Sequence, residues 1–153
     1  MAVLKLKVRG LEQLLGDLAK LDQDVQRGID DAVNATGLEL RADIVRRYQR
    51  GPATGRTYQK YNPRRTHQAS APGQAPMTDT GRLAAGTVYN KVGFARVRVE
   101  NCVKYARALE YGNTSGKGNI APRPAWRPAI KKMRPIFRKR MERVLAEAVN
   151  RAT

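Results

Sequence analysis

The chain has 153 residues, 41% of them hydrophobic, and 30 lysines and arginines against 13 acids give a formal charge of +17. This length is typical of a single domain, here residues 1–153, and the charge calls for a polyanionic partner. One cysteine and one histidine exclude a disulfide framework, a thiolate metal cage and most histidine-based catalysis. The sequence has neither the apolar core of a secretory signal nor a run long enough to span a membrane, so we expect no membrane partner.

The positive charge is concentrated in two stretches. Residues 1–40 have a net charge of −2 and residues 41–153 a net charge of +19. Eight basic residues lie within 41–65, where Asp43 is the lone acid, and eight lie within 123–140, which has no acid. A face that only keeps a protein soluble usually mixes both signs. The two stretches therefore indicate a surface for nucleic-acid phosphates or an acidic protein, with a solvated face as the alternative.

The spacing of apolar residues predicts the elements of the first third of the chain. Alternating apolar and basic residues predict a strand at 4–8, and leucines at helical spacing predict a short helix at 11–21. From 25 to 48 an apolar residue recurs at nearly every fourth position, which predicts a longer helix. Gly51-Pro52 is expected to end that helix.

Residues 51–80 show neither helical nor strand periodicity. Gly, Pro, Ser, Thr, Gln and Arg dominate, and Pro63, Pro72 and Pro76 argue against regular structure. A loop of this length is unusual within a compact domain. We therefore expect an extended loop insertion that is mobile in the free protein and ordered by a partner.

The next segments predict a β-hairpin and a helical turn. Residues 83–89 and 94–100 are expected to be strands, joined by a turn at 90–93. Val97 and Val99 alternate with charged residues, so one face of the hairpin should be polar. Residues 105–111 predict a short helical turn.

The last part of the chain predicts a proline-rich arm and a terminal helix. Three prolines make 120–129 an extended arm, and an apolar stripe makes 129–151 a C-terminal helix. Pro135 is expected either to kink this helix or to mark its start. The predicted fold class is α+β: a small antiparallel sheet, formed by the N-terminal strand and the hairpin, packs against the long helix, with a kinked C-terminal helix and a long Pro/Gly-rich loop.

Residue types for catalysis or metal binding do not gather at any useful spacing. Asp79, Glu100 and Glu110 are scattered, and His67 has no nucleophile nearby, so it reads as a solvated or phosphate-contacting side chain rather than a general base. Cys102 follows a predicted strand and is expected in the core. We expect no enzyme activity, no cofactor and no metal.

Three segments in a fixed order resemble a known family. They are DTGRL at 79–83, YARALEYG at 105–112 and PRPAWRPA at 122–129, the last one preceding a basic helix. With the strand, short helix and long helix before them, they resemble the small neck and tail-component proteins of long-tailed bacteriophages, the head–tail connector, head–tail joining or tail-completion family. The resemblance covers nearly the whole chain. Many members lack the insert at about 51–75, so this chain looks like a longer subgroup.

The resemblance implies a structural virion protein without catalytic activity. It implies a ring, with a hexamer favoured, that joins tail to head around the DNA channel. The implied partners are other copies of the chain, adjacent neck, portal-side and tail proteins, and packaged DNA through non-specific contact. The implied location is the neck region of the virion, after synthesis in the host cytoplasm. The alternative is a free-standing, sequence-independent nucleic-acid-binding protein, which accounts for the charge but not for the three ordered segments.

Two sets of candidate site residues follow. The basic side chains expected to face the DNA channel or an acidic partner are Arg46, Arg47, Arg50, Arg56, Arg64, Arg65, Lys131, Lys132, Arg134, Arg138 and Arg140. The side chains expected at a subunit interface, or in the core beneath it, are Tyr105, Leu109, Tyr111, Arg123, Trp126 and Arg127. Trp126 is a natural interface anchor because Trp and Arg dominate many interfaces, and an ordinary core position is its alternative.

Overall fold

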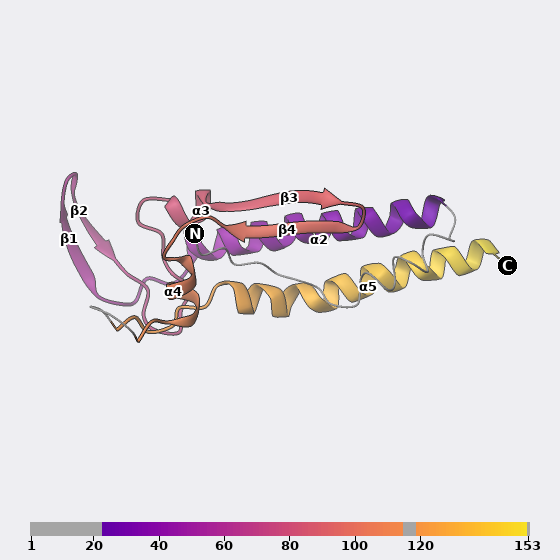
Figure 1. The fold of residues 1–153 in the computed structure, drawn as a ribbon. Coiled ribbons are helices and arrows are strands. Elements are labelled where there is room, and N and C mark those ends of the chain that lie inside the picture. Colours follow the sequence, from indigo (N-terminus) through magenta and orange to yellow (C-terminus); the bar gives the residue numbers. More distant parts are fainter. Residues whose placement is uncertain (1–22, 115–118, 153) are drawn as a thin grey trace.

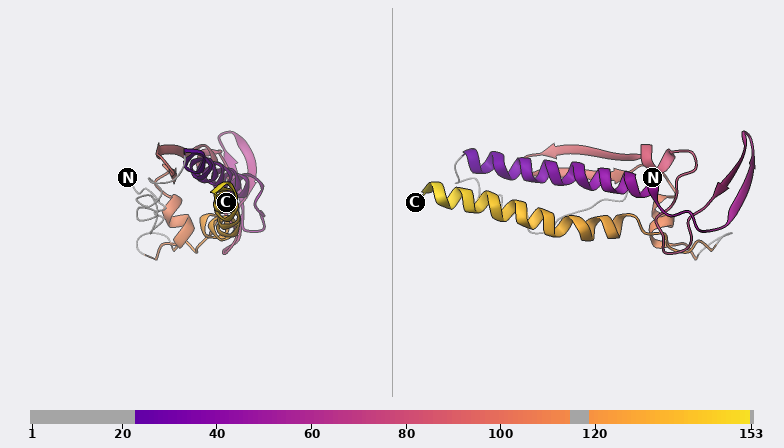
Figure 2. Two further views of the ribbon diagram at one scale, coloured as in Figure 1. Left: turned by 90° about the vertical axis from the view of Figure 1, so that its right-hand side faces the viewer. Right: turned by 180° about the vertical axis from the view of Figure 1, so that it is seen from behind.

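Two long antiparallel helices form the body of the protein in the computed structural model, which describes residues 23–114 and 119–152. Helix α2 spans Gln23–Arg50 and helix α5 spans Trp126–Ala152. They lie side by side along most of their length, and the chain is elongated in the same direction (Figures 1 and 2). The strand predicted at 4–8 and the helix predicted at 11–21 lie outside the described residues.

Helix α2 confirms the long helix that apolar spacing predicts. Its large buried side chains recur every four residues, with one step of seven, and so share one face of the helix. They are Val25, Ile29, Val33, Leu40, Ile44 and Tyr48. Arg47 and Arg50 occupy the last turn, where the helix dipole favours cations. Within the described residues, this face of α2 contributes to both hydrophobic clusters of the core.

The predicted hairpin is confirmed, with a later start. Strand β3, Thr87–Gly93, pairs antiparallel with β4, Arg96–Asn101. The first strand was expected from residue 83, but Arg82–Ala85 forms a short helix, α3, and this boundary is wrong. Gly81 turns the chain with a φ of 78°, and Leu83 is thereby directed into the core from a helical turn instead of a strand.

One face of the β3–β4 hairpin lies directly on α2. Tyr89 pairs across the hairpin with Val99, which is buried, while Arg96 and Arg98 are exposed on the other face. A side chain at Gly37 of α2 would place its Cβ 2.7 Å from Val97 Cγ2, closer than carbon atoms tolerate. The polar outer face is therefore as predicted, and the close approach of helix and hairpin requires glycine at position 37.

The segment predicted to be an irregular loop contains a second hairpin, so that prediction is wrong. Strand β1, Thr57–Tyr61, pairs antiparallel with β2, Arg64–Gln68. Pro63 lies in the turn between them, where its missing N–H is not needed by the ladder. Pro72 and Pro76 come after β2 and do not interrupt it. This hairpin projects from one end of the helical body (Figure 1).

The two helices that follow the β3–β4 hairpin come in the predicted order. Ala106–Tyr111 forms helix α4, as expected for 105–111. Helix α5 begins at Trp126, before the expected residue 129, and Pro128 lies in its first turn, where proline is tolerated. Pro135 lies inside this continuous helix, so the alternative that it marks the start is wrong.

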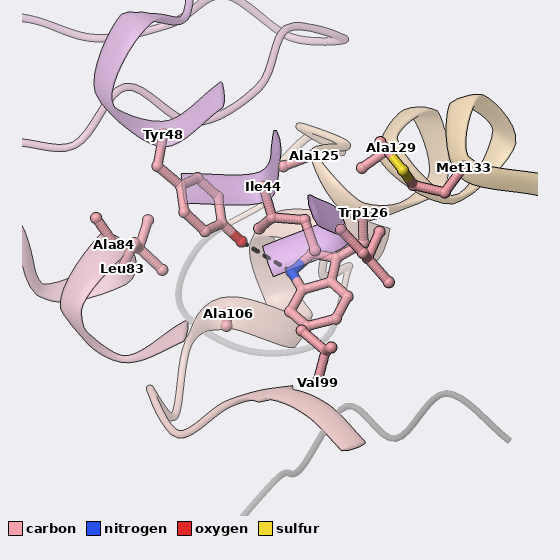
Figure 3. Packing of buried hydrophobic residues seen from close by; sticks show 11 residues of the cluster. Ile44, Tyr48, Leu83, Ala84, Val99, Ala106, Ala125, Trp126, Ala129 and Met133 are labelled. Carbon is pink, nitrogen blue, oxygen red and sulfur yellow. Dashed lines mark hydrogen bonds between the residues drawn. The ribbon is translucent and has the colours of Figure 1, made fainter. Parts of the chain in front are cut away.

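The core consists of two clusters along the helical body. The larger one lies at the end from which β1–β2 projects, and it surrounds Tyr48 and Trp126 with side chains from α2, α3, β4, α4 and α5 (Figure 3). The smaller cluster joins the first half of α2 to the second half of α5 through Val25, Ile29 and Val33. The larger cluster packs α2, α3, β4, α4 and α5 together at the end of the body from which the β1–β2 hairpin projects.

A buried carboxylate at the α2–α5 contact should make stability depend on pH. Asp43 is 5% exposed and accepts hydrogen bonds from Lys132 Nζ at 2.7 Å and Arg47 Nε at 2.7 Å. Burial raises the pKa of Asp43, but these two cationic donors outweigh burial and hold its pKa below the ordinary value of 3.8. Its contribution to stability is therefore present above about pH 4 and is lost as the pH falls through the lower folded-state pKa.

Asp43→Asn is expected to lower the unfolding free energy at pH 7 by about 1–3 kcal/mol, because both cations lose their charged acceptor. The difference from the parent chain should shrink as the pH falls from about 5 to 2. Urea unfolding across this range measures it. A difference that stays constant with pH would show that the ion pair does not titrate with folding.

Candidate interaction surface at the hairpin end

The fold brings the two basic stretches of the sequence together. Because α2 and α5 are antiparallel, the last half of α2 lies beside the first half of α5, as the contacts from Lys132 to Asp43 and from Trp126 to Tyr48 show. The β1–β2 hairpin projects from this same end (Figure 2). We call this part of the molecule, residues 41–68 and 123–140, the basic end.

The opposite end of the helical body has compensated charge. Asp24 pairs with Arg27, and Asp30 accepts hydrogen bonds from Lys91 and from the backbone N–H of Ala95 at 2.9 Å. At the far part of α5, Arg143 pairs with Glu147. Among the described residues, the charges at this end are therefore largely paired, whereas unpaired cations gather at the basic end.

Four of the predicted basic residues are held by acids of the same chain. Arg47 and Lys132 share Asp43, and Arg65 pairs with Asp79 at 2.6 Å. Arg140 links α5 to Glu39 and to the Thr36 hydroxyl of α2. Lys132, Arg65 and Arg140 thereby connect different parts of the fold, whereas Arg47 pairs with an acid of its own helix.

The remaining predicted basic residues are exposed. Arg46 lies 3.9 Å from Asp43, and Arg56 lies 5.4 Å over the Tyr58 ring. Within the part of the chain that the structure describes, five others make no hydrogen bond or ion pair through their side chains. They are Arg50, Arg64, Lys131, Arg134 and Arg138. These seven side chains are the ones most available to an anionic partner.

The projecting hairpin is held at its base by Asp79. The carboxylate lies 3.0 Å from Lys60 Nζ, 2.6 Å from an Arg65 nitrogen and 3.6 Å from His67 Nδ1. The hydrogen bond from Lys60 is the main reason that the pKa of Asp79 lies below its usual range. His67, left by its sequence context as a solvated or phosphate-contacting residue, thus lies beside a carboxylate. These ion pairs hold the base of the β1–β2 hairpin against the segment that contains Asp79.

The hairpin itself buries little of its surface. All but one residue in each strand is exposed, and Tyr61, next to the turn, is 81% exposed. A two-stranded hairpin with no buried face gains almost no hydrophobic stabilisation from the body. Its sequence is better explained by contact with another molecule than by packing within the chain.

The predicted interface residues divide between surface and core. Tyr105 and Tyr111 are exposed, Leu109 packs against the larger core cluster, and Arg127 lies 5.4 Å over the Tyr111 ring. Trp126 is 1% exposed and donates a hydrogen bond from Nε1 to the Tyr48 hydroxyl at 2.9 Å. The core alternative therefore holds for Trp126. Its side chain is not free to anchor a neighbouring subunit.

A buried carboxylate that sequence reasoning passed over organises the start of α5. Glu110, 2% exposed, accepts hydrogen bonds from the backbone N–H groups of Ala125, Trp126 and Arg127 at 2.7, 3.0 and 3.0 Å. These are N–H groups of the first turn, which have no partner within the helix. Glu110 therefore caps α5 from a different element, and no local spacing in the sequence marks this contact.

Other groups that chemistry would need are not assembled. Among residues 23–114 and 119–152, no three His, Cys, Asp or Glu side chains are placed to hold a metal ion. Cys102 is exposed, so its predicted core position is wrong; it follows Asn101, whose side chain points inward, and neighbouring residues of an extended chain face opposite ways. No helix in the described part is both long and apolar enough to cross a membrane.

Comparisons of the chain with protein-family models, with curated proteins and with solved structures found no match.

Proposed function

We propose that this chain is a structural subunit of the neck of long-tailed bacteriophage particles, where copies assemble into a ring around the DNA channel and join tail to head. The observation that carries the proposal is the basic end: two basic stretches lie together, next to a hairpin that projects from the body. The order of the three sequence segments described above supports the same assignment.

The basic end fits a sequence-independent contact with DNA. Its exposed arginines and lysines come from α2, β2 and α5, and five of them lack an acidic partner among the described residues. Phosphate contacts of this kind give affinity without reading sequence. In a closed ring, each copy repeats the same surface, so a channel bordered by such surfaces would hold DNA without selecting its sequence.

The mass of the purified chain by light scattering, at low and high salt, tests the assembly. Mass spectrometry of intact particles tests the location. A ring in solution, or a monomer present at a few copies per particle, supports the proposal; in the second case docking on a neighbouring protein triggers assembly. A monomer at every salt concentration that is absent from particles contradicts it.

The second candidate is a free-standing nucleic-acid-binding protein without sequence preference. The same unpaired basic side chains favour it, since they would act equally well in a monomer. A stable monomer that binds DNA tightly, with an affinity that falls steeply with salt, would identify it. The particle measurement distinguishes it from the neck subunit.

Removal of two unpaired cations from the basic end is expected to weaken DNA binding. For Arg64→Gln with Arg138→Gln, we expect about a tenfold loss of affinity for duplex DNA at 0.1 M salt, and a salt slope reduced by about 2, because each phosphate contact contributes roughly 0.9. Fluorescence anisotropy over a salt series measures both quantities.

The matched control removes the same charge elsewhere. Arg98 lies on the outer face of β4 and Arg143 on the far part of α5, so Arg98→Gln with Arg143→Gln leaves the basic end intact. We expect the control to retain the parent salt slope to within about half a phosphate contact. Equal losses in both double variants would show that only net charge matters.

A further inference from the structure

A cavity of about 330 Å³ lies at the foot of the β1–β2 hairpin, and the proposed function makes no use of it. Its walls come from three parts of the chain: the segment from residue 69 to 83, Tyr105 and Leu109 at helix α4, and Arg123 of the proline-rich arm. These parts are distant in sequence and meet only through the fold. The cavity is therefore a feature of the folded end and not of a single loop.

Two cations in the cavity wall have no partner. Arg82 and Arg123 line it, and neither side chain makes a hydrogen bond or ion pair with any residue that the structure describes. Among the described residues, Arg123 Nε is buried and lacks an acceptor. Asp79 Oδ1, in the same wall, is also buried and accepts no hydrogen bond, although it lies 2.6 Å from an Arg65 nitrogen in an ion pair. A buried guanidinium N–H without an acceptor is costly, and native proteins seldom leave one. The unsatisfied donor thus indicates a missing acceptor.

The one carboxylate in the wall does not supply that acceptor. Asp79 lines the cavity but is engaged by Lys60 and Arg65 of the hairpin, at 3.0 and 2.6 Å. Its charge is compensated there, so the two arginines leave the cavity with net positive charge. The ligand it suits is an anion, and a singly charged one is repelled less by Asp79 than a doubly charged phosphate.

The rest of the wall is suited to a hydrocarbon stem. Leu83 and Leu109 contribute aliphatic surface, with Pro76 and Met77 beside them. A guanidinium group presents paired N–H donors that match the two oxygens of a carboxylate. Cationic and apolar groups in one small cavity therefore select a carboxylate that is attached to an aliphatic chain.

We propose that this cavity binds a carboxylate on a short aliphatic stem, with Arg123 and Arg82 as its cationic partners. Glutamate and aspartate side chains of a protein partner carry this group, and so do small free aliphatic acids. The two sources share the same recognition chemistry, and the choice of probes below separates them. The inference does not depend on the ring or on DNA binding.

The test uses the full chain with ¹⁵N-labelled arginine side chains and three probes: sodium propionate, glutamate blocked at both its backbone ends, and sodium chloride at the same ionic strength. Propionate and blocked glutamate are expected to shift the Arg123 Nε–H resonance in a saturable way, and chloride is not. Tighter binding of blocked glutamate than of propionate assigns the site to a protein side chain, and the reverse order to a free acid.

Substitutions establish where the probe binds. Arg123→Gln and Arg82→Gln are each expected to weaken probe affinity about tenfold or more, since each removes a charge-assisted pair. Arg107→Gln is the matched control, because Arg107 is an exposed residue of α4 that does not line the cavity. It should change affinity less than twofold. Thermal unfolding with and without probe shows which variants remain folded.

Three results would overturn the proposal. One is no saturable shift at Arg123 Nε–H with either carboxylate. Another is an equal shift with chloride, which would mean simple screening. The third is unchanged affinity in a folded Arg123→Gln variant. Ring formation and DNA affinity are measured separately, so failure here leaves the proposed function untouched.

Discussion

Replacement of Trp126 with alanine is expected to lower the unfolding free energy by about 3–5 kcal/mol, the range found when large aromatic side chains are deleted from a core. Trp126 is 1% exposed and lies where α2, α4 and α5 meet (Figure 3). The cavity left behind would be shared by all three helices. Denaturant unfolding followed by circular dichroism measures the loss.

Two milder variants separate packing from hydrogen bonding at this site. Burial raises the pKa of Tyr48, so its hydroxyl stays protonated and accepts the indole N–H at 2.9 Å. Tyr48→Phe keeps the ring but leaves the indole donor buried without an acceptor, and should cost about 1–3 kcal/mol. Trp126→Phe removes the donor and part of the volume together. A Trp126→Ala loss under about 1 kcal/mol would contradict a core role and return Trp126 to the list of candidate interface anchors.

Glu110→Gln is the second substitution with a large expected effect. The carboxylate accepts hydrogen bonds from three backbone N–H groups at the first turn of α5. Its negative charge also interacts favourably with the positive end of the helix dipole. An amide retains one oxygen and turns an NH₂ group toward donors. We expect a loss of about 2–4 kcal/mol in unfolding free energy, since charge-assisted hydrogen bonds are lost and a buried donor is left unpaired.

The position of Glu110 gives this loss a local signature. Amide hydrogen exchange in the first turn of α5 should accelerate more than in α2, because the cap serves that turn directly. Glu142→Gln is the control: Glu142 is an exposed acid in the same helix and should change stability by less than about 0.5 kcal/mol. Equal effects of the two substitutions would show that Glu110 contributes charge and not a cap.

Elements with a strong apolar period were predictable from the sequence. In α2, an apolar residue at nearly every fourth position predicts a helix with one apolar face, and the structure buries that face. The β3–β4 hairpin was marked by alternation at Val97 and Val99. The start of β3 was misplaced because Leu83 and Ala84 are apolar in either conformation, and only the turn at Gly81 decides between strand and helix.

The β1–β2 hairpin was missed because it has no buried face. Strand prediction depends on alternation between apolar and polar residues, and nearly every residue of TYQKY and RRTHQ is exposed. The prolines of this segment predict irregular structure, yet Pro63 occupies the turn between the two strands. A strand pair held by its ladder and by ion pairs to Asp79 leaves no hydrophobic signal in the sequence.

The sequence predicted which residue types make up the candidate site but not how they are arranged in space. The two basic stretches are visible in the sequence, but their juxtaposition depends on the antiparallel packing of α2 and α5. The sequence also does not reveal which cations are neutralised. Asp43 and Asp79 each engage residues from other elements, and such pairs arise only in three dimensions.

The separation of charge along the helical body has an electrical consequence. Among the described residues, acids and bases are paired at the start of α2, whereas the basic end has uncompensated cations. This uneven distribution of charge gives the molecule a permanent dipole moment along its long axis. In the field of a polyanion such a molecule experiences a torque as well as an attraction. If such a partner exists, we expect the field to orient the molecule before contact, so that the β1–β2 hairpin reaches the polyanion first. Orientation during the approach would then raise the fraction of encounters that begin at the basic end.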